Sequence, residues 1–327
     1  MIDASRIFNI DSEESFEALT FEIFEFQFEN NPIYRSYCDL LFKHPSSIRT
    51  LEDIPFLPIQ FFKSHTILSS NELIRKTFSS SGTTGQNTSK HHITNLKIYE
   101  ESFRNAFNVF YGDIKDYTIL ALLPSYSERE DSSLIYMVEH LIRESNKEKS
   151  GFYLYNLSEL ASTLKNLDNQ NEKVLLIGVS FALLDLIESH KLQLKHTIIM
   201  ETGGMKGRRK EIVRHELHRL LKDGLGVKTI HSEYGMTELL SQAYSKGNGV
   251  FETPPWMKVL IRDTDDPLTI TENLNKTGGI NIIDLANINS CTFIATQDLG
   301  KRIFNNQFEV IGRFDNSDIR GCNLLTL

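Results

Sequence analysis

The sequence has few cysteines, no long apolar run and no excess of positive charge, and each of these absences excludes a class of protein. Its 327 residues contain only three cysteines, Cys38, Cys291 and Cys322. Their spacing is not that of a metal site, and an odd number does not fit a disulfide framework, so we expect reduced thiols.

The longest apolar runs, TILALLP at 118–124 and VLLIGV at 174–179, are too short to span a membrane, which takes about 20 residues. The N-terminus also lacks the basic start and apolar core of a signal peptide. We therefore expect a cytoplasmic protein with no membrane span.

The charge balance argues against a nucleic-acid partner. Lys and Arg number 35 against 43 Asp and Glu, for a formal net charge of -8. Such a chain has no general basic field to hold a polyanion. With 40% hydrophobic and 24% charged residues, it has the composition of a globular protein with a large core.

Apolar strand patterns alternate with helical patterns through the middle of the chain. The pattern predicts strands near 118–123, 173–177 and 196–200, and helices near 131–144, 180–190 and 207–222. Strands separated by helices indicate a mainly parallel sheet covered by helices, so the predicted fold class is α/β.

The two ends of the chain differ from its middle. From Asp11 to Asn30 a capped helical pattern places its apolar residues on one face, namely Phe16, Leu19, Ile23 and Phe24. After Trp256, short β-rich runs alternate with turn signals. We predict one domain over 1–327, with approximate subdomains 1–255 (α/β) and 256–327 (smaller and β-rich).

The stretch SSSGTTGQNTSK, residues 79–90, is almost devoid of apolar side chains. Its glycines, Gly82 and Gly85, let successive backbone N–H groups converge on an anion, and the hydroxyls of Ser81, Thr83 and Thr84 add donors. The spacing of a Walker phosphate loop is absent. The stretch therefore suits a phosphate, and its alternative interpretation is a surface loop.

Three further groups of residues suit a nucleotide. HSEYGMTELLSQAY places a ring, a glycine, a hydroxyl and a carboxylate within Tyr234–Glu238, which can stack a base, approach a phosphate and bind Mg2+. Asp298 in TQDLGKR and Arg313 in EVIGRFDNSDIRGC are suited to sugar hydroxyls. Each alone fits a turn or a solvated pair equally well.

Other reactive residues have simpler interpretations. LIGVSFA nearly matches the nucleophile elbow of serine esterases, but Ala182 replaces its last glycine, and no His and acid can be assigned as partners of Ser180. His215 and His218 lack the spacing of a zinc helix and are interpreted as a solvated helix face. Cys38 and Cys291 lie in apolar patterns and are expected to be small buried hydrophobes.

The order of the nucleotide motifs is more specific than any one of them. SGTTG is followed by the Gly-Gly turn of ETGGMKG, then YGMTE, then T-x-D-x-G, then GR near the end. This order resembles the large N-terminal domain of the adenylate-forming superfamily, which includes acyl-CoA synthetases, luciferases and peptide-synthetase adenylation domains. The resemblance extends along nearly the whole chain.

The resemblance implies a ligand, ATP, and a role for each motif. The SGTTG residues would hold its phosphates, the Gly-Gly turn would flank the adenine, Tyr234 would stack on it, and an Asp–Arg pair would hold the ribose. In chain order, these nucleotide-binding positions are Ser81, Gly82, Thr83, Thr84, Gly85, Gly203, Gly204, Tyr234, Asp298 and Arg313.

It also implies catalytic residues and an acyl pocket. Thr237 would contact the α-phosphate, and Glu238 would bind Mg2+. The turn after VLLI would line the pocket for the acid, with Gly178, Val179, Ser180 and Phe181.

Two features depart from the superfamily pattern. Gln86–Ser89 separate the phosphate stretch from Lys90, whereas the usual lysine follows two residues after the last glycine. We also expect the small C-terminal domain, with its adenylation lysine, to be absent.

Six segments resemble one branch, the acyl-protein synthetases of LuxE type: IPFLPIQFFKSH, ETGGMKGRRKE, SEYGMTELLSQAY, PPWMKVLIRD, GGINIIDLANI and DIRGC. In that family a fatty acid is activated with ATP, passed to a cysteine near the C-terminus, here Cys322, and then delivered to a reductase. The resemblance implies a fatty acid or another carboxylic acid as substrate and an acyl-accepting reductase or carrier protein as partner. The alternatives are a nucleotide-binding scaffold without catalysis and a serine esterase or acyltransferase using Ser180.

Overall fold

The computed structural model describes residues 2–80, 88–203, 212–304 and 306–314. The chain divides into two compact units. Unit 1 combines Met1–Ser70 with Pro255–Leu327, and unit 2 is Asn71–Pro254.

The centre of unit 2 is a sheet in the order β10-β9-β8-β7-β6-β4-β5. Strands β5, β4, β6, β7 and β8 pair in parallel, while β9 and β10 continue the sheet in antiparallel pairing. The strands span Thr118–Leu122 (β4), Gly151–Phe152 (β5), Val174–Gly178 (β6), Thr197–Glu201 (β7), His231–Tyr234 (β8), Ala243–Ser245 (β9) and Val250–Glu252 (β10). All residues of β4 and β6 are buried, as expected for parallel strands covered on both faces.

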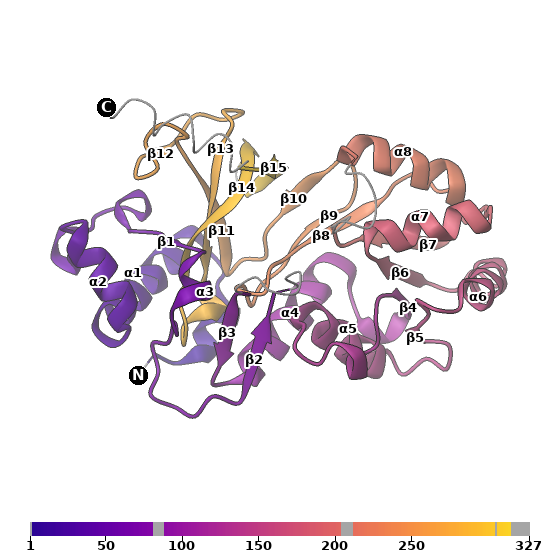
Figure 1. Cartoon of the computed structure of the whole chain (residues 1–327), viewed down its shortest axis with the longest axis horizontal. Helices are drawn as coiled ribbons and strands as arrows, with labels where there is room; N and C mark the ends of the chain where they lie inside the picture. Colours follow the sequence, from indigo (N-terminus) through magenta and orange to yellow (C-terminus); the bar gives the residue numbers. More distant parts are fainter. Residues whose placement is uncertain (1, 81–87, 204–211, 305, 315–327) are drawn as a thin grey trace. The chain divides into compact units, whose positions relative to one another are not determined.

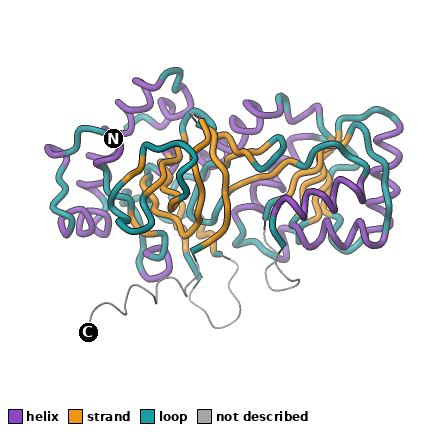
Figure 2. The backbone as a smooth tube through the Cα atoms, turned by 90° about the horizontal axis from the view of Figure 1, so that it is seen from above, coloured by secondary structure: helices purple, strands orange, loops and turns teal. Residues whose placement is uncertain are grey.

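Helices cover both faces of this sheet. Figure 1 shows α4 and α5 on one face and α7 and α8 on the other, and Figure 2 shows the parallel strands between helices. The helices span Leu96–Tyr111 (α4), Ser133–Ser145 (α5), Leu157–Asn169 (α6), Ser180–Ser189 (α7) and Arg214–Leu225 (α8), with 3-10 turns at Ile114–Asp116 (η4) and Tyr126–Glu128 (η5). The predicted α/β fold class and the three predicted strands are confirmed.

The helix predicted near 207–222 begins later in the described residues. Val213 has an extended backbone, with ψ of 148°, so α8 begins at Arg214. Residues 207–211 lie outside the described part of the chain.

The serine-rich stretch 79–90 connects two strands of a hairpin in unit 2. Strand β2, Lys76–Ser79, pairs in antiparallel fashion with β3, Lys90–Ile93. Beyond the last pair, the N–H of Ser80 donates to the carbonyl of Ser89 at 3.1 Å, and the N–H of Ser89 donates to Oγ of Ser80 at 3.0 Å. These bonds fix both ends of the stretch.

Unit 1 contains an antiparallel sheet in the order β12-β11-β13-β14-β15, with β1 pairing in parallel on β14. The strands span Leu57–Pro58 (β1), Met257–Arg262 (β11), Ile270–Thr271 (β12), Gly278–Asp284 (β13), Phe293–Phe304 (β14) and Gln307–Arg313 (β15). Four of them fall on the β-rich runs that the sequence places after Trp256.

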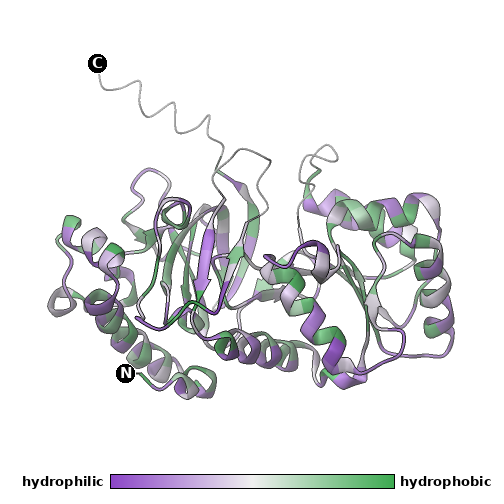
Figure 3. Ribbon diagram, turned by 60° about the horizontal axis from the view of Figure 1, so that its bottom comes forward, coloured by the Kyte–Doolittle hydropathy of each residue, from purple (hydrophilic) through white to green (hydrophobic). Residues whose placement is uncertain are grey.

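Helices from the N-terminus complete unit 1. They are α1 (Glu13–Asn30), α2 (Pro32–Leu40) and α3 (Phe61–Ser64), with 3-10 turns at Ala4–Asn9 (η1), Pro45–Ser47 (η2), Leu51–Asp53 (η3) and Leu285–Asn287 (η6). Ser12 caps α1, and the predicted face of Phe16, Leu19, Ile23 and Phe24 is buried. Figure 3 shows that the helices carry both hydrophobic and hydrophilic residues.

The N-terminal 70 residues group with the C-terminal strands, whereas the subdomain prediction placed them in the α/β part. The grouping depends on contacts between residues far apart in sequence. Phe24 of α1 meets Phe293 of β14 edge-on, with ring centroids 5.9 Å apart. Gln27, fully buried, donates to the carbonyls of Asn287 and Ile288 and accepts from the N–H of Thr292.

Replacing Gln27 by Leu is expected to lower the free energy of unfolding by roughly 2–4 kcal/mol, because buried backbone groups lose their partners. Glu25→Leu, at an exposed position of the same helix, is the matched control and should change stability little. Urea unfolding measures both. Equal midpoints for the two variants would contradict this account of how the N-terminal segment is held.

Two predictions from the sequence, the burial of two cysteines and the lack of a membrane span, can be compared with the structure. Cys38 and Cys291 are free and fully buried, which confirms their expected placement as small buried hydrophobes. Of the helices in the described residues, none combines the length and apolarity that crossing a membrane requires.

Candidate active site

Three of the predicted motifs follow the carboxyl ends of neighbouring parallel strands in unit 2. The register aligns Leu122 of β4 with Gly178 of β6, Gly178 with Glu201 of β7, and Glu201 with Ser232 of β8. The predicted groups Gly178–Phe181, Gly203 and Tyr234–Glu238 therefore lie along one edge of the sheet. In open α/β sheets this edge is where ligands bind.

The first group turns from β6 into α7. A Cβ at Gly178 would lie 2.8 Å from Cβ of Leu122, so only glycine fits there. Ser180 begins α7 and is 2% exposed. Among the described residues, no hydrogen bond joins Ser180 to a histidine, so the structure adds no catalytic partner for the esterase alternative.

The second group is a turn after β7 that a buried carboxylate holds. Gly203 has φ of +72°, a conformation that favours glycine, and its N–H donates to Oε2 of Glu201 at 2.7 Å. The other carboxylate oxygen lies 3.5 Å from Nε of Arg214 and 3.5 Å from Nε2 of His218. Burial, the largest single effect, opposes ionisation of Glu201, but His218, Arg214, Ser232 and the Gly203 N–H together outweigh it and keep its pKa below the usual value.

His218 differs from the sequence interpretation. It was expected on a solvated helix face, but it is 7% exposed and faces Glu201. The helix buries it because Leu217, Leu221 and Leu225 form the apolar side of α8 around it. No group of three or more His, Cys, Asp or Glu suited to a metal occurs among the described residues.

The third group is the loop after β8. Tyr234 is 8% exposed, and its ring lies 5.8 Å from the Phe251 ring, centroid to centroid. A turn follows, in which the N–H of Leu239 donates to the carbonyl of Met236 at 3.2 Å. Glu238, within this turn, is 6% exposed.

His91 connects this loop to the hairpin of the serine-rich stretch. Its Nδ1 lies 2.9 Å from the carbonyl oxygen of Thr237. Since a carbonyl only accepts, Nδ1 carries the proton and donates it. Burial lowers the pKa of His91 to about 4, so the ring is neutral at neutral pH. Strand β3, directly after the stretch, is thereby joined to Thr237.

Asp298 and Arg313 are brought together in unit 1. They are cross-strand partners on β14 and β15, and Nε of Arg313 donates to Oδ1 of Asp298 at 3.1 Å. The Asp298 side chain is 8% exposed and that of Arg313 is 81% exposed. The pair therefore presents a fixed carboxylate and an exposed guanidinium.

Several predicted residues lie outside the described part of the chain. They are Ser81, Gly82, Thr83, Thr84, Gly85, Gly204 and Cys322. Their roles stay predictions from the sequence.

Sequence reasoning missed His91, Glu201 and Arg214. The only local signal was the glutamate directly before the predicted turn in ETGG. Nothing in the sequence pairs His91 with Thr237 or Arg214 with Glu201, because each pair is made by the fold.

Glu233, between these motifs, is a buried carboxyl that faces Tyr244 across the β8–β9 pair. Burial, with a smaller effect of Glu201, raises its pKa to about 8 from an ordinary 4.5. The folded state thus holds a proton that the unfolded chain releases between these values. The contribution of Glu233 to the free energy of unfolding is fully present below pH 4.5 and is lost as the pH rises to about 8.

We therefore expect Glu233→Gln to stabilise the protein relative to wild type more at pH 8 than at about pH 5. The difference in free energy of unfolding between variant and wild type is expected to change by roughly 2–4 kcal/mol between these two pH values, since each pKa unit corresponds to about 1.4 kcal/mol. Denaturant unfolding at both pH values measures it. If the difference in free energy of unfolding between variant and wild type stayed constant with pH, it would contradict the burial of an ionisable Glu233.

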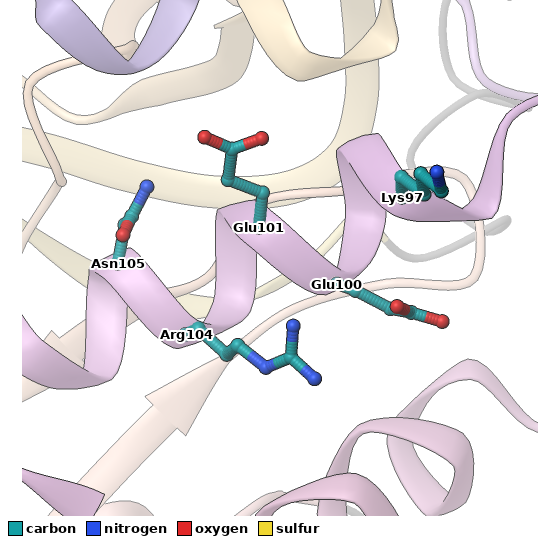
Figure 4. A pocket seen from close by; sticks show the side chains of 5 residues that line it. All are labelled: Lys97, Glu100, Glu101, Arg104 and Asn105. Atoms are coloured by element: carbon teal, nitrogen blue, oxygen red, sulfur yellow. The ribbon is translucent and has the colours of Figure 1, made fainter.

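A separate surface hollow is lined by five residues of α4, namely Lys97, Glu100, Glu101, Arg104 and Asn105. Figure 4 shows Glu101 and Asn105 projecting to one side of the helix, and Glu100 and Arg104 to another. Nε of Arg104 pairs with Glu144 at 2.6 Å, and Glu100 accepts from the Tyr136 hydroxyl at 2.7 Å. These side chains do not converge on one point, so the hollow is not the candidate site.

Comparison with known proteins adds information at the level of the fold. No protein-family model matches this chain, and no curated protein sequence matches it. Among solved structures, ATP-bound MatB from Rhodopseudomonas palustris is similar with a TM-score of 0.55 and 14% identity, over 75% of this chain and 49% of MatB. This chain thus spans about half the length of MatB.

A 2-hydroxyisobutyryl-CoA ligase is similar over more of its length. Its postadenylation state, in complex with 2-HIB-AMP, matches with a TM-score of 0.63 and 12% identity, over 93% of this chain and 68% of that one. An open conformation with 2-HIB-AMP and CoA matches with a TM-score of 0.60 and 14% identity, over 93% and 75%. The chain therefore has the mixed α/β fold of the adenylate-forming ligases.

Proposed function

We propose that this chain is an ATP-dependent ligase that forms an acyl-adenylate from a carboxylic acid. The observation that carries the proposal is the alignment of three motif loops, Gly178–Phe181, Glu201–Gly203 and Tyr234–Glu238, along the carboxyl edge of one parallel sheet. The shared fold supports it, because solved structures of that fold hold ATP or an acyl-AMP.

In this proposal the motifs bind ATP. The residues Ser81–Gly85 hold its phosphates, the turn at Gly203 and Gly204 flanks the adenine, and Tyr234 stacks on it. Asp298 accepts hydrogen bonds from the ribose hydroxyls, while Arg313 donates to them. The acid occupies a pocket lined by Gly178–Phe181.

Glu238 fits a magnesium ion by its chemistry. Mg2+ prefers oxygen ligands and is usually held by one or two carboxylates together with substrate phosphates. Glu238 supplies one carboxylate, in a loop held by the bond from His91 to Thr237. When bound, the ion neutralises charge on the phosphates.

The proposed reaction has two steps. A carboxylate oxygen of the acid attacks the α-phosphorus, the bond to the β-phosphate oxygen breaks, and pyrophosphate leaves. Thr237 donates a hydrogen bond to the α-phosphate as charge develops there. A cysteine thiolate then attacks the acyl carbon, forms a thioester and releases AMP.

The finer proposal is a fatty acid:protein ligase of LuxE type, and it rests on the sequence resemblance. Cys322 is the proposed acyl carrier, and an acyl reductase or carrier protein is the proposed recipient. Burial of the other two cysteines supports this choice.

Exchange of radiolabelled pyrophosphate into ATP tests the proposal, with a panel of fatty acids and shorter carboxylic acids. Exchange that depends on an added acid is expected, and the preferred acid identifies the substrate class. ATP binding without exchange for any acid would instead favour the nucleotide-binding scaffold.

A further inference from the structure

A continuous set of contacts joins the Gly203 turn to the Tyr234 ring. It runs from the Gly203 N–H to the Glu201 carboxylate, then to the Arg214 guanidinium, and then to the Phe251 ring. The guanidinium carbon of Arg214 lies 5.0 Å from the Phe251 ring centroid, and Phe251 lies 5.8 Å from Tyr234.

The members of this set come from four elements of unit 2. Glu201 ends β7, Arg214 begins α8, Phe251 lies in β10 and Tyr234 ends β8. Figure 1 shows the sheet and α8 that supply them. No local sequence pattern relates these residues, so their arrangement is a property of the fold.

Burial makes these contacts strong. The Glu201 side chain is 3% exposed, that of Arg214 is 29% exposed, and Phe251 is fully buried. A guanidinium over an aromatic face is attractive, and the attraction increases when the pair is desolvated. An ion pair shielded from water is also screened little by salt.

We propose that Glu201 and Arg214 are positioning residues that hold the two sides of the adenine site, the Gly203 turn and the Tyr234 ring. The inference rests on the proposed function, in which these two elements flank the base. Neither residue contacts the phosphates in this account. Their loss therefore weakens recognition of adenosine and leaves the binding of pyrophosphate intact.

Steady-state pyrophosphate exchange with Arg214→Met tests the inference. We expect the KM for ATP to rise about tenfold, while kcat changes by less than about twofold and the KM for pyrophosphate is unchanged. Arg219→Met is the matched control. Arg219 lies on the same helix, is half exposed and pairs with Glu216, so its loss should change none of these values.

A double-mutant cycle tests whether the two residues act together. Glu201→Gln keeps an acceptor for the Gly203 N–H but loses the charge that holds Arg214. The double variant is expected to raise the KM for ATP no more than either single variant, because each breaks the same connection. Fully additive effects would overturn the inference. Thermal unfolding of each variant identifies any that do not fold, and Arg214→Met is the more conservative because its site is partly exposed.

Failure of the inference and failure of the proposed function give different results. Equal ATP affinity for wild type and Arg214→Met, measured by calorimetry, would overturn the inference alone. Absence of ATP binding by wild type would overturn the proposed function and the inference with it.

Discussion

Replacing Glu238 by Gln is expected to lower acid-dependent pyrophosphate exchange by about 100-fold. Gln keeps the shape of the side chain and an oxygen acceptor but removes the negative charge that Mg2+ prefers. Glu238 is 6% exposed and lies in the turn next to Thr237, whose carbonyl His91 holds. The loop should therefore keep its position in the variant, so the substitution should lower the rate of exchange much more than it lowers stability.

The magnesium dependence of exchange separates this role from a structural one. Exchange by Glu238→Gln should need more Mg2+ for half-maximal rate than exchange by wild type. Glu216→Gln, on the surface of α8, serves as control and should match wild type. Near-normal exchange by Glu238→Gln at limiting Mg2+ would contradict the assignment of Glu238 to the metal.

Replacing Cys322 by Ser is expected to abolish the acyl thioester on the protein while acid-dependent pyrophosphate exchange continues. The first reaction step does not use the thiol, whereas the second requires a thiolate as acceptor. Labelling with a radioactive acid and ATP, followed by hydroxylamine treatment, measures the thioester. Intact mass of wild type after exposure to ATP, Mg2+ and a mixed pool of acids identifies the acid.

The other two cysteines are poor acceptors for a physical reason. Cys38 and Cys291 are fully buried, and burial raises the pKa of Cys38 to about 12 and raises that of Cys291 as well. Both stay protonated and inaccessible near neutral pH. Cys38→Ala should therefore retain the label, and a label that persists in Cys322→Ser would show that another thiol carries the acyl group.

Elements with a strong local pattern could be predicted from the sequence. The apolar face of α1 follows from the helical spacing of its hydrophobic residues. The strands β4, β6 and β7 follow from short continuous apolar runs, which are typical of parallel strands buried on both faces. The order of strands and helices then places Gly178 and Gly203 at carboxyl ends, where a parallel sheet binds ligands.

The remaining features depend on contacts between distant parts of the chain. Gln27 joins α1 to the residues before β14, across about 260 positions of sequence, and so brings the N-terminus into unit 1. His218 was expected in solvent because its neighbours are charged, but its own position faces Glu201. Such pairings leave no periodic signal, so a single sequence does not predict them.

The oxygen of the acid provides the most direct test of the central claim, that the chain forms an acyl-adenylate. The acid is labelled with 18O in its carboxylate, supplied with ATP, Mg2+ and the purified protein, and hydroxylamine is added to accept the acyl group. Attack of the carboxylate on the α-phosphorus predicts that mass spectrometry finds one 18O atom in the AMP released. AMP without the label, or ADP as the nucleotide product, would contradict the account.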